Sequence, residues 1–214
     1  METIAATHDH GALLGATQDL INTLELSDDG PTDSLATADA ALAFLAERGL
    51  GHLDDLAAQA RRDGDAWLAR VLAARAALRD VWDAQVERRP ASPDALAAIN
   101  ALLDRSPRVE LRAAPTGVQV SHRHPDDDPT GEALARIATP LVEAIATGET
   151  TRFRVCANHD CRWVFEDESR AGRRRWCDMS SCGNRAKVRR YRERHKGAQD
   201  VHPATSPIAI IDEG

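Results

Sequence analysis

The chain of 214 residues has room for one average domain and a smaller one, and its hydrophobic content of 43% permits a buried core. The net charge of -7 is unevenly distributed: residues 151–196 carry 14 Lys and Arg against 6 Asp and Glu, whereas the rest carries 13 against 28. Neither a signal segment nor an apolar run long enough to span a membrane is visible, so we expect a soluble, cytoplasmic protein without a membrane partner.

The segment before residue 104 is dominated by apolar residues at helical spacing. We expect a first helix over 13–26, a helix capped by Thr37 and ending at Gly49, a short helix over 53–61, a long helix over 65–89, and a helix opened by Ser92 and Pro93. At the end of the first helix, Asn22 and Thr23 are predicted to cap the helix, and the alternative is that they line an effector pocket.

The long helix is the predicted scaffold of the N-terminal domain. Trp67 and Trp82 lie on its apolar stripe, which indicates a place in the core. The charged side chains outside this stripe are expected at the surface. They are Arg70, Arg75, Arg79 and Asp80.

Alternating apolar residues at 109–111 and 118–120 around a Pro-Thr-Gly turn predict a β-hairpin. A helix is expected over 131–147, with a kink or restart at Pro140. The intervening His- and Asp-rich segment 122–129 is interpreted as a solvated loop rather than a metal cluster. The composition changes at Thr150, so we predict a mainly helical domain over residues 12–149.

All four cysteines lie in the basic segment, as two Cys-x4-Cys pairs separated by fifteen residues. They are Cys156, Cys161, Cys177 and Cys182. Four thiolates suit tetrahedral Zn²⁺, and paired cysteines in a reducing compartment are typical of metal sites. The alternatives are buried thiols or two disulfides, and His159 is a competing ligand whose simpler interpretation is a solvated loop histidine.

A small α+β module over residues 151–196 is predicted around these cysteines. Strands are expected at Phe153–Val155 and Trp163–Phe165, with a third short strand at Arg175–Cys177 and Cys182 in the first turn of the last helix. This order resembles a treble-clef layout. Five of the eight aromatic residues fall here, as expected for a module too small to build a core without metal. Residues 197–214 are predicted to be a disordered tail.

The last helix carries a basic stripe formed by Arg185, Arg189, Arg192 and Lys196. Lys187, Arg190 and Arg194 flank its other edge, and a run of three arginines precedes the second cysteine pair. The pattern favours contact with a polyanion, and a merely solvated cationic helix is the alternative. The predicted nucleic-acid-binding residues are Arg173, Arg174, Arg175, Asn184, Arg185, Lys187, Arg189, Arg190, Arg192, Arg194 and Lys196.

The sequence Cys182-Gly183-Asn184-Arg185, together with the other three cysteines, resembles the CGNR zinc-finger family. The segment Asp19-Leu20-Ile21-Asn22-Thr23 and the helical region after it resemble the ABATE domain that precedes this finger in bacterial proteins proposed to be stress-induced transcription regulators. The resemblance implies zinc ligation by the four cysteines and DNA binding by the start of the last helix. For Asn184 and Arg185, bracing of the zinc loop remains an equal alternative.

The leading hypothesis is therefore a bacterial DNA-binding transcription regulator with a structural zinc site, bound to double-stranded DNA. The acidic N-terminal domain would sense an effector, self-associate or restrain the finger. An RNA-binding protein and a protein-interaction module are the alternatives. The sequence contains no nucleophile-plus-base motif, phosphate loop or dinucleotide fingerprint, so no enzymatic activity is expected.

Overall fold

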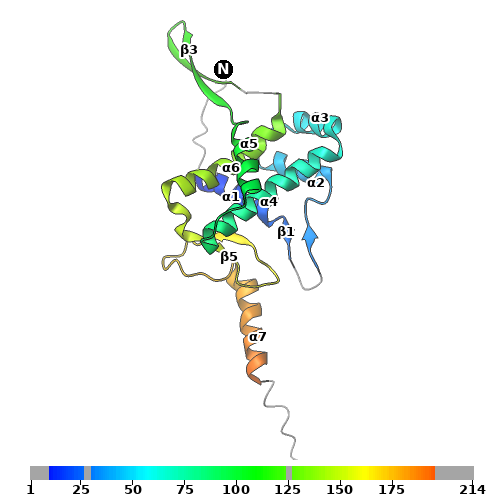
Figure 1. The fold of residues 1–214 in the computed structure, drawn as a ribbon, viewed down its shortest axis with the longest axis vertical. Helices are drawn as coiled ribbons and strands as arrows, with labels where there is room; N and C mark the ends of the chain where they lie inside the picture. Colours follow the sequence, from blue (N-terminus) through cyan, green and yellow to red (C-terminus); the bar gives the residue numbers. More distant parts are fainter. Residues whose placement is uncertain (1–9, 27–29, 124–126, 196–214) are drawn as a thin grey trace, which may run out of the picture. The chain divides into compact units, whose positions relative to one another are not determined.

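The computed structural model describes residues 10–26, 30–123 and 127–195 (Figure 1). These residues form two compact units that divide between Cys177 and Asp178. The first unit is mainly helical and contains three antiparallel strand pairs, and the second contains a π-helical turn and one α-helix. The predicted fold class, a mainly α N-terminal domain with a β-hairpin followed by a small α+β module with four clustered cysteines, is confirmed.

The first unit contains six α-helices among the described residues: α1 His10–Asn22, α2 Ala38–Glu47, α3 Leu53–Asp63, α4 Asp65–Glu87, α5 Pro93–Leu103 and α6 Pro129–Thr147. Its strands are β1 Leu24–Glu25, β2 Thr32–Asp33, β3 Arg108–Ala114, β4 Gly117–Arg123, β5 Phe153–Val155 and β6 Val164–Glu166. A 3-10 turn, η1 Glu149–Arg152, precedes β5. The second unit consists of the π-helical turn η2 Met179–Gly183 and helix α7 Asn184–His195.

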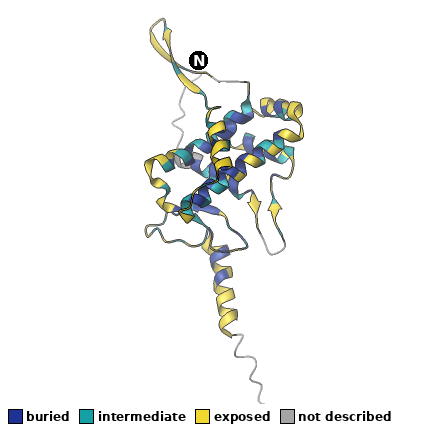
Figure 2. Ribbon diagram, in the orientation of Figure 1, coloured by how far each residue is buried: buried dark blue, intermediate teal, exposed yellow. Residues whose placement is uncertain are grey.

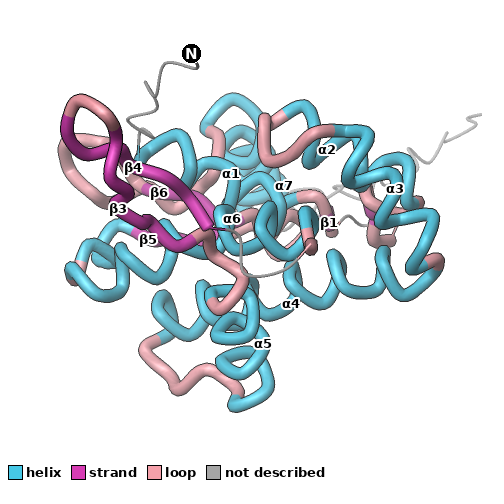
Figure 3. The backbone as a smooth tube through the Cα atoms, turned by 90° about the horizontal axis from the view of Figure 1, so that it is seen from above, coloured by secondary structure: helices cyan, strands magenta, loops and turns pink. Residues whose placement is uncertain are grey.

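Helix α4 lies at the centre of the first unit and contacts α1, α2, α3, α5 and α6 (Figure 3). As predicted, Trp67 and Trp82 are fully buried in its core face. The same core cluster includes Phe153 of β5 and Val164 of β6. The hydrophobic core therefore continues past the change in composition at residue 150. None of the described helices combines the length and apolar character that a membrane span requires.

Several local predictions are confirmed by the caps of the helices. Thr37 accepts a hydrogen bond from the amide of Ala40 at the start of α2, and the Ser92 side chain caps α5 in the same way. Gly49 follows α2 with a φ of 63°, a left-handed conformation that glycine adopts without a steric cost.

Two boundaries were predicted wrongly. The first helix ends at Asn22 rather than at residue 26, because residues 24–25 form a strand that pairs with Thr32–Asp33. Helix α6 is one continuous element through the buried Pro140, so of the predicted kink or restart the restart is wrong. Burial of the residues around this proline, including Ile137 and Leu141, holds the helix together despite the missing amide donor.

Arg75 is buried rather than exposed, which corrects the prediction for the long helix. Its guanidinium donates to both carboxylate oxygens of Asp33, at 2.6 and 2.7 Å, and to the Thr23 hydroxyl at 3.0 Å. Hydrogen bonding from Arg75, opposed by burial, holds the pKa of Asp33 below its ordinary value. The arginine thus ties the β1–β2 segment to α4.

The predicted hairpin is present as β3 and β4, joined by the Pro115–Thr116 turn. Its four large apolar residues are exposed, as Figure 2 shows by the yellow colour of the strands. The loop predicted at 122–129 is shorter than expected, because its first residues belong to β4, which extends to Arg123, and its last belongs to α6, which begins at Pro129. His124 and Asp126 lie outside the described residues.

Asp128 anchors the start of α6 to the helices beside it. It accepts a bidentate pair of hydrogen bonds from Arg70, at 2.8 and 2.5 Å, another from Gln59 at 2.7 Å, and one from the amide of Gly131 at 3.0 Å. Burial alone would raise the pKa of Asp128, but these hydrogen bonds outweigh it and hold the pKa well below the ordinary value of 3.8.

Replacing Asp128 with alanine is expected to lower the free energy of unfolding by about 3 kcal/mol, because α6 loses its cap and Arg70 keeps an unpaired charge. Denaturant unfolding at neutral pH measures this change. The exposed neighbour provides the control, since Asp127→Ala should change the free energy by less than about 0.5 kcal/mol. Equal losses in the two variants would contradict the anchoring role.

The same variant tests the pH dependence of stability. The pKa of Asp128 is depressed in the folded state. Its contribution to the free energy of unfolding is therefore complete above pH 3.8, the pKa of the unfolded group, and is lost as the pH falls through the folded pKa. The wild type should therefore lose more stability than Asp128→Ala between about pH 5 and pH 2.

Candidate metal centre and basic helix

The first cysteine pair is carried by the β5–β6 hairpin. The two strands pair antiparallel, with Val155 opposite Val164, and the amide of Cys156 extends the ladder by donating to the Trp163 carbonyl at 2.8 Å. The strand predicted at Phe153–Val155 is confirmed, and the second one begins one residue later than predicted, at Val164. Because Cys156 directly follows β5, the hairpin fixes the backbone from which the first sulfur projects.

A tight turn brings Cys161 back towards Cys156. The carbonyl of the buried Asn158 accepts hydrogen bonds from the amides of Cys161, at 3.0 Å, and Arg162, at 3.1 Å. Arg162 has a φ of 56°, a left-handed conformation that reverses the chain at the end of the turn. The side chain of His159 is 73% exposed and lies 2.8 Å from the Asp160 carboxylate, in agreement with its interpretation as a loop histidine.

The third cysteine lies in a bend rather than on the predicted third strand. One backbone hydrogen bond, from the Ala157 amide to the Arg175 carbonyl at 2.8 Å, joins this segment to the first pair. The Arg174 guanidinium donates to the carbonyl of Cys177 and lies 5.2 Å from the centre of the Phe165 ring. One backbone hydrogen bond does not make a strand, but this bond holds the segment with Cys177 beside the first cysteine pair.

Asp167 organises the loop that leads to Cys177. Its buried carboxylate accepts hydrogen bonds from the Ser169 hydroxyl and amide and, at 2.7 Å, from the Arg174 amide. Burial opposes ionisation, but these donors hold the pKa of Asp167 below its ordinary value. From η1 and β5, Arg152 and Arg154 donate to backbone carbonyls of the same loop, so these two basic residues stabilise the fold around the cysteines.

The sulfur atoms of the four cysteines all lie within 4.8 Å of one another. No disulfide is formed, and the Cys161 and Cys177 sulfurs are 3.6 Å apart. Tetrahedral coordination of Zn²⁺ with bonds of about 2.3 Å places sulfur atoms roughly 3.8 Å apart. The donor set and its spacing therefore fit a metal ion held by four thiolates.

The electrostatics of the cluster favour the same interpretation. Burial raises the pKa of Cys177, and the neighbouring charges of Cys156 and Cys161 raise it further. Several thiolates cannot accumulate in one buried place unless a cation compensates their charges, and metal binding supplies that cation.

In the second unit, Cys182 lies in the π-helical turn before α7 rather than in the first turn of the helix. Asp178 caps this turn: its carboxylate accepts from the Ser180 amide at 2.6 Å, and its carbonyl accepts from the Gly183 amide at 2.9 Å. The Arg185 guanidinium lies 3.2 Å from the Cys182 sulfur. This contact favours a bracing role for Arg185, one of the two alternatives for that residue.

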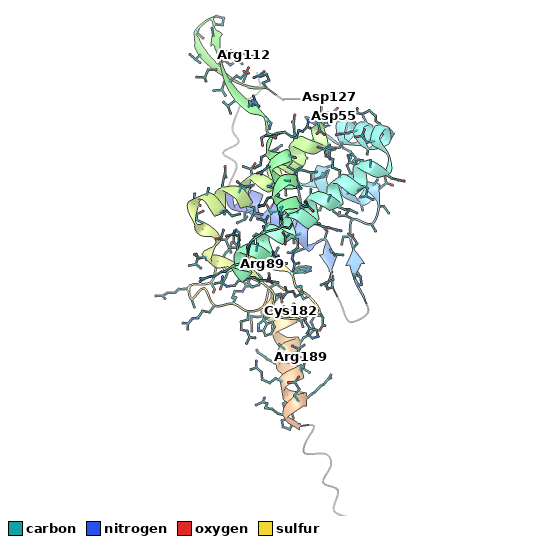
Figure 4. The ribbon with its side chains drawn as sticks, viewed as in Figure 1. Asp55, Arg89, Arg112, Asp127, Cys182 and Arg189 are labelled. Atoms are coloured by element: carbon teal, nitrogen blue, oxygen red, sulfur yellow. The ribbon has the colours of Figure 1, made fainter. Side chains whose placement is uncertain are left out.

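Helix α7 is almost entirely exposed, with Ala186 as its one buried residue, and Figure 2 shows it in yellow. Figure 4 shows Arg189 projecting from the helix, with Cys182 at its beginning. The predicted contact residues on this helix are all exposed. They are Asn184, Arg185, Lys187, Arg189, Arg190, Arg192 and Arg194.

The remaining predicted contact residues differ in position. Arg173 and Arg175 are exposed, whereas Arg174 is partly buried and bonded within the cysteine loop. Lys196 lies outside the described residues. Val188 and Tyr191, which form the less polar side of the helix, are 41% and 57% exposed. The basic helix therefore presents both its charged stripe and this edge to solvent.

Asn22, at the end of α1, was not predicted to contact the cysteine module. Its side chain bonds to both backbone groups of Val164 in β6. The predicted capping role belongs to its neighbour, because the Thr23 hydroxyl donates to the Leu20 carbonyl at 2.7 Å. The sequence signal that could have identified Asn22 is an amide side chain at a helix end whose cap is already supplied by Thr23.

Comparison with protein families agrees with the resemblance found in the sequence. Residues 16–148 match the ABATE family, described as "Putative stress-induced transcription regulator", and residues 152–195 match the CGNR zinc finger. A search of curated proteins finds no match. The two families occur in the expected order along the chain.

Replacing Cys161 with serine is expected to reduce bound metal from about one ion per chain to well below that value, because an alcohol is a much poorer metal ligand than a thiolate. Mass spectrometry of the purified protein for bound elements measures the change. Met179→Ser is the matched control, since it removes an exposed sulfur from outside the cluster. Full metal content in Cys161→Ser would argue against the four-sulfur site.

Proposed function

Because the chain belongs to the ABATE family and carries a CGNR zinc-finger segment behind that domain, we propose that it is a transcription regulator that binds double-stranded DNA through the basic helix α7. The observation that carries this proposal is the exposed helix itself. Six of its twelve residues are Lys or Arg, and Glu193 is its one acid.

The metal in this proposal is a structural Zn²⁺ held by Cys156, Cys161, Cys177 and Cys182. Four thiolates complete a tetrahedral shell and leave no position for a reactive water, so the ion organises the fold and performs no reaction. The proposed protein is accordingly not an enzyme. The zinc holds the turn from which α7 begins, and the helix supplies the contacts with nucleic acid.

The proposed contacts follow from the charge and placement of the side chains. An exposed arginine neutralises phosphate charge and releases bound counterions, whatever the base sequence. Arg185, Arg189, Arg192 and Lys196 form the phosphate-binding stripe, and Lys187, Arg190 and Arg194 flank the other edge of the helix. A guanidinium has five N–H donors, so Arg185 can contact a phosphate as well as the Cys182 sulfur. If each of the four neutralises one phosphate, log K falls with log salt concentration with a slope of about -3.6.

The N-terminal domain takes the regulatory part in this proposal. Residues 1–150 carry 25 Asp and Glu against 13 Lys and Arg, so this part of the chain repels nucleic acid and leaves binding to the finger. We assign to it the recognition of an effector or self-association, within a bacterial cytoplasm.

The double variant Arg189→Ala/Arg192→Ala is expected to reduce the magnitude of the salt slope by about 1.8, because two phosphate contacts are lost. Fluorescence anisotropy of a short mixed-sequence duplex, titrated with the zinc-loaded full-length protein between about 50 and 200 mM salt, measures the slope. The full chain is needed because Phe153 and Val164 belong to the core of the first unit.

The matched control is Arg61→Ala/Arg62→Ala, which removes the same charge from exposed positions on α3. It should leave the slope unchanged. An equal reduction in both double variants would show a general charge effect and no α7 interface, and absence of salt-dependent binding by the wild type would refute the proposal. Displacement by structured RNA at lower concentration than by duplex DNA would favour the RNA-binding alternative.

A further inference from the structure

The side chain of Asn22 completes the outer edge of strand β6. Its Nδ2 donates to the Val164 carbonyl at 2.9 Å, and its Oδ1 accepts from the Val164 amide at 2.8 Å. An amide side chain that pairs with both backbone groups of one residue imitates the neighbouring strand of a sheet. The contact joins residues 142 positions apart in the sequence.

A second residue of α1 contacts the same strand. Gln18 lies one helical turn before Asn22, and its Oε1 accepts from the Glu166 amide at 3.3 Å. The two side chains therefore share one face of α1 and satisfy the edge of β6 that β5 does not cover. Of the two, Asn22 makes the shorter and the double contact, and its partner Val164 is nearer to Cys161 in the sequence than Glu166, the partner of Gln18.

Val164 directly follows Trp163, the residue of the hairpin that bonds to Cys156. The Trp163 carbonyl accepts the hydrogen bond from the Cys156 amide, and Val164 itself is fully buried in the core. A shift of Val164 would therefore move Trp163 and, through it, the backbone of Cys156. It would also move the end of the turn that carries Cys161.

The other strand of the hairpin is fixed independently. The Phe153 ring stacks on the Trp82 ring with centroids 3.9 Å apart, and the Trp82 indole donates to the Arg154 carbonyl at 3.1 Å. Helix α4 thus fixes β5, and α1 fixes β6. Each strand of the hairpin thus contacts a different helix, so its position depends on the helices of the N-terminal domain.

From these contacts we infer that Asn22 is a positioning residue of the metal site, which couples helix α1 to the cysteine pair Cys156 and Cys161. The inference rests on the metal site in the proposed function and is independent of DNA binding. It gives the N-terminal domain a physical route to the finger: a change in the position of α1 alters how tightly the cysteines hold Zn²⁺. Mutating a residue that orients metal ligands without binding the metal typically lowers metal affinity by 10- to 100-fold.

Replacing Asn22 with alanine is expected to weaken Zn²⁺ binding by about tenfold, because Val164 loses both partners and the hairpin loosens. Competition with a chromophoric chelator, using the full-length protein, measures the affinity. Thr23→Ala is the matched control, since its buried hydroxyl donates to the Leu20 carbonyl and accepts from Arg75, on α1 and α4. Its Zn²⁺ affinity should equal that of the wild type.

The possible results separate three claims: the positioning role of Asn22, the metal site and DNA binding. Unchanged affinity in Asn22→Ala, or an equal loss in both variants, would overturn the positioning role. A wild type that binds no Zn²⁺ would refute the metal site and this inference together. A wild type that binds Zn²⁺ but no duplex would refute only the proposed DNA binding.

A measurement on the unaltered protein covers the case in which Asn22→Ala does not fold. Coupling between two sites is reciprocal, so metal binding must strengthen the contact that strengthens metal binding. Hydrogen exchange of the Val164 amide and the Asn22 side-chain amide should be about tenfold slower in the zinc-loaded protein than after chelation. Equal exchange rates in the two states would overturn the inference.

Discussion

The stack of Trp82 on Phe153 is the contact on which the cysteine module most depends. The two rings are nearly parallel, with an angle of 6° between their planes, and both are fully buried. Burial of two aromatic side chains of this size outweighs any single hydrogen bond in the hairpin. The stack therefore makes β5 part of the N-terminal core, and Cys156 begins from a backbone that the core has already fixed.

The charge boundary and the packing boundary consequently differ. Composition changes near residue 150, where the basic segment begins, yet Phe153 and Val164 belong to the core formed by the helices. The basic residues of this stretch also divide by role: Arg152, Arg154 and Arg174 donate to backbone carbonyls near the cysteines, whereas those of α7 face solvent. Net charge alone counts both kinds equally, which is why it locates the basic segment but overstates the number of side chains available to a partner.

Features set by local chemistry could be predicted from the sequence, and features set by distant partners could not. Thr37 and Ser92 cap their helices because a cap needs only its own next turn, and the four cysteines cluster as their paired spacing indicated. Arg75 and Asn22 find their partners 42 and 142 residues away. Periodicity places Arg75 outside the apolar stripe, and only the fold shows that it is buried and paired with Asp33.

The second unit shows why a metal is needed for the proposed interface. A helix of twelve residues is marginal in water, and α7 gains little from burial because Ala186 is its one buried residue. Its many like charges add repulsion. The compensating terms are the Asp178 cap, the contact of Arg185 with the Cys182 sulfur, and the bond that Cys182 makes when it holds a metal. Of these, metal coordination would be by far the strongest, so in the proposed function a helix that exposes its charges to a polyanion depends on the ion that Cys182 would hold.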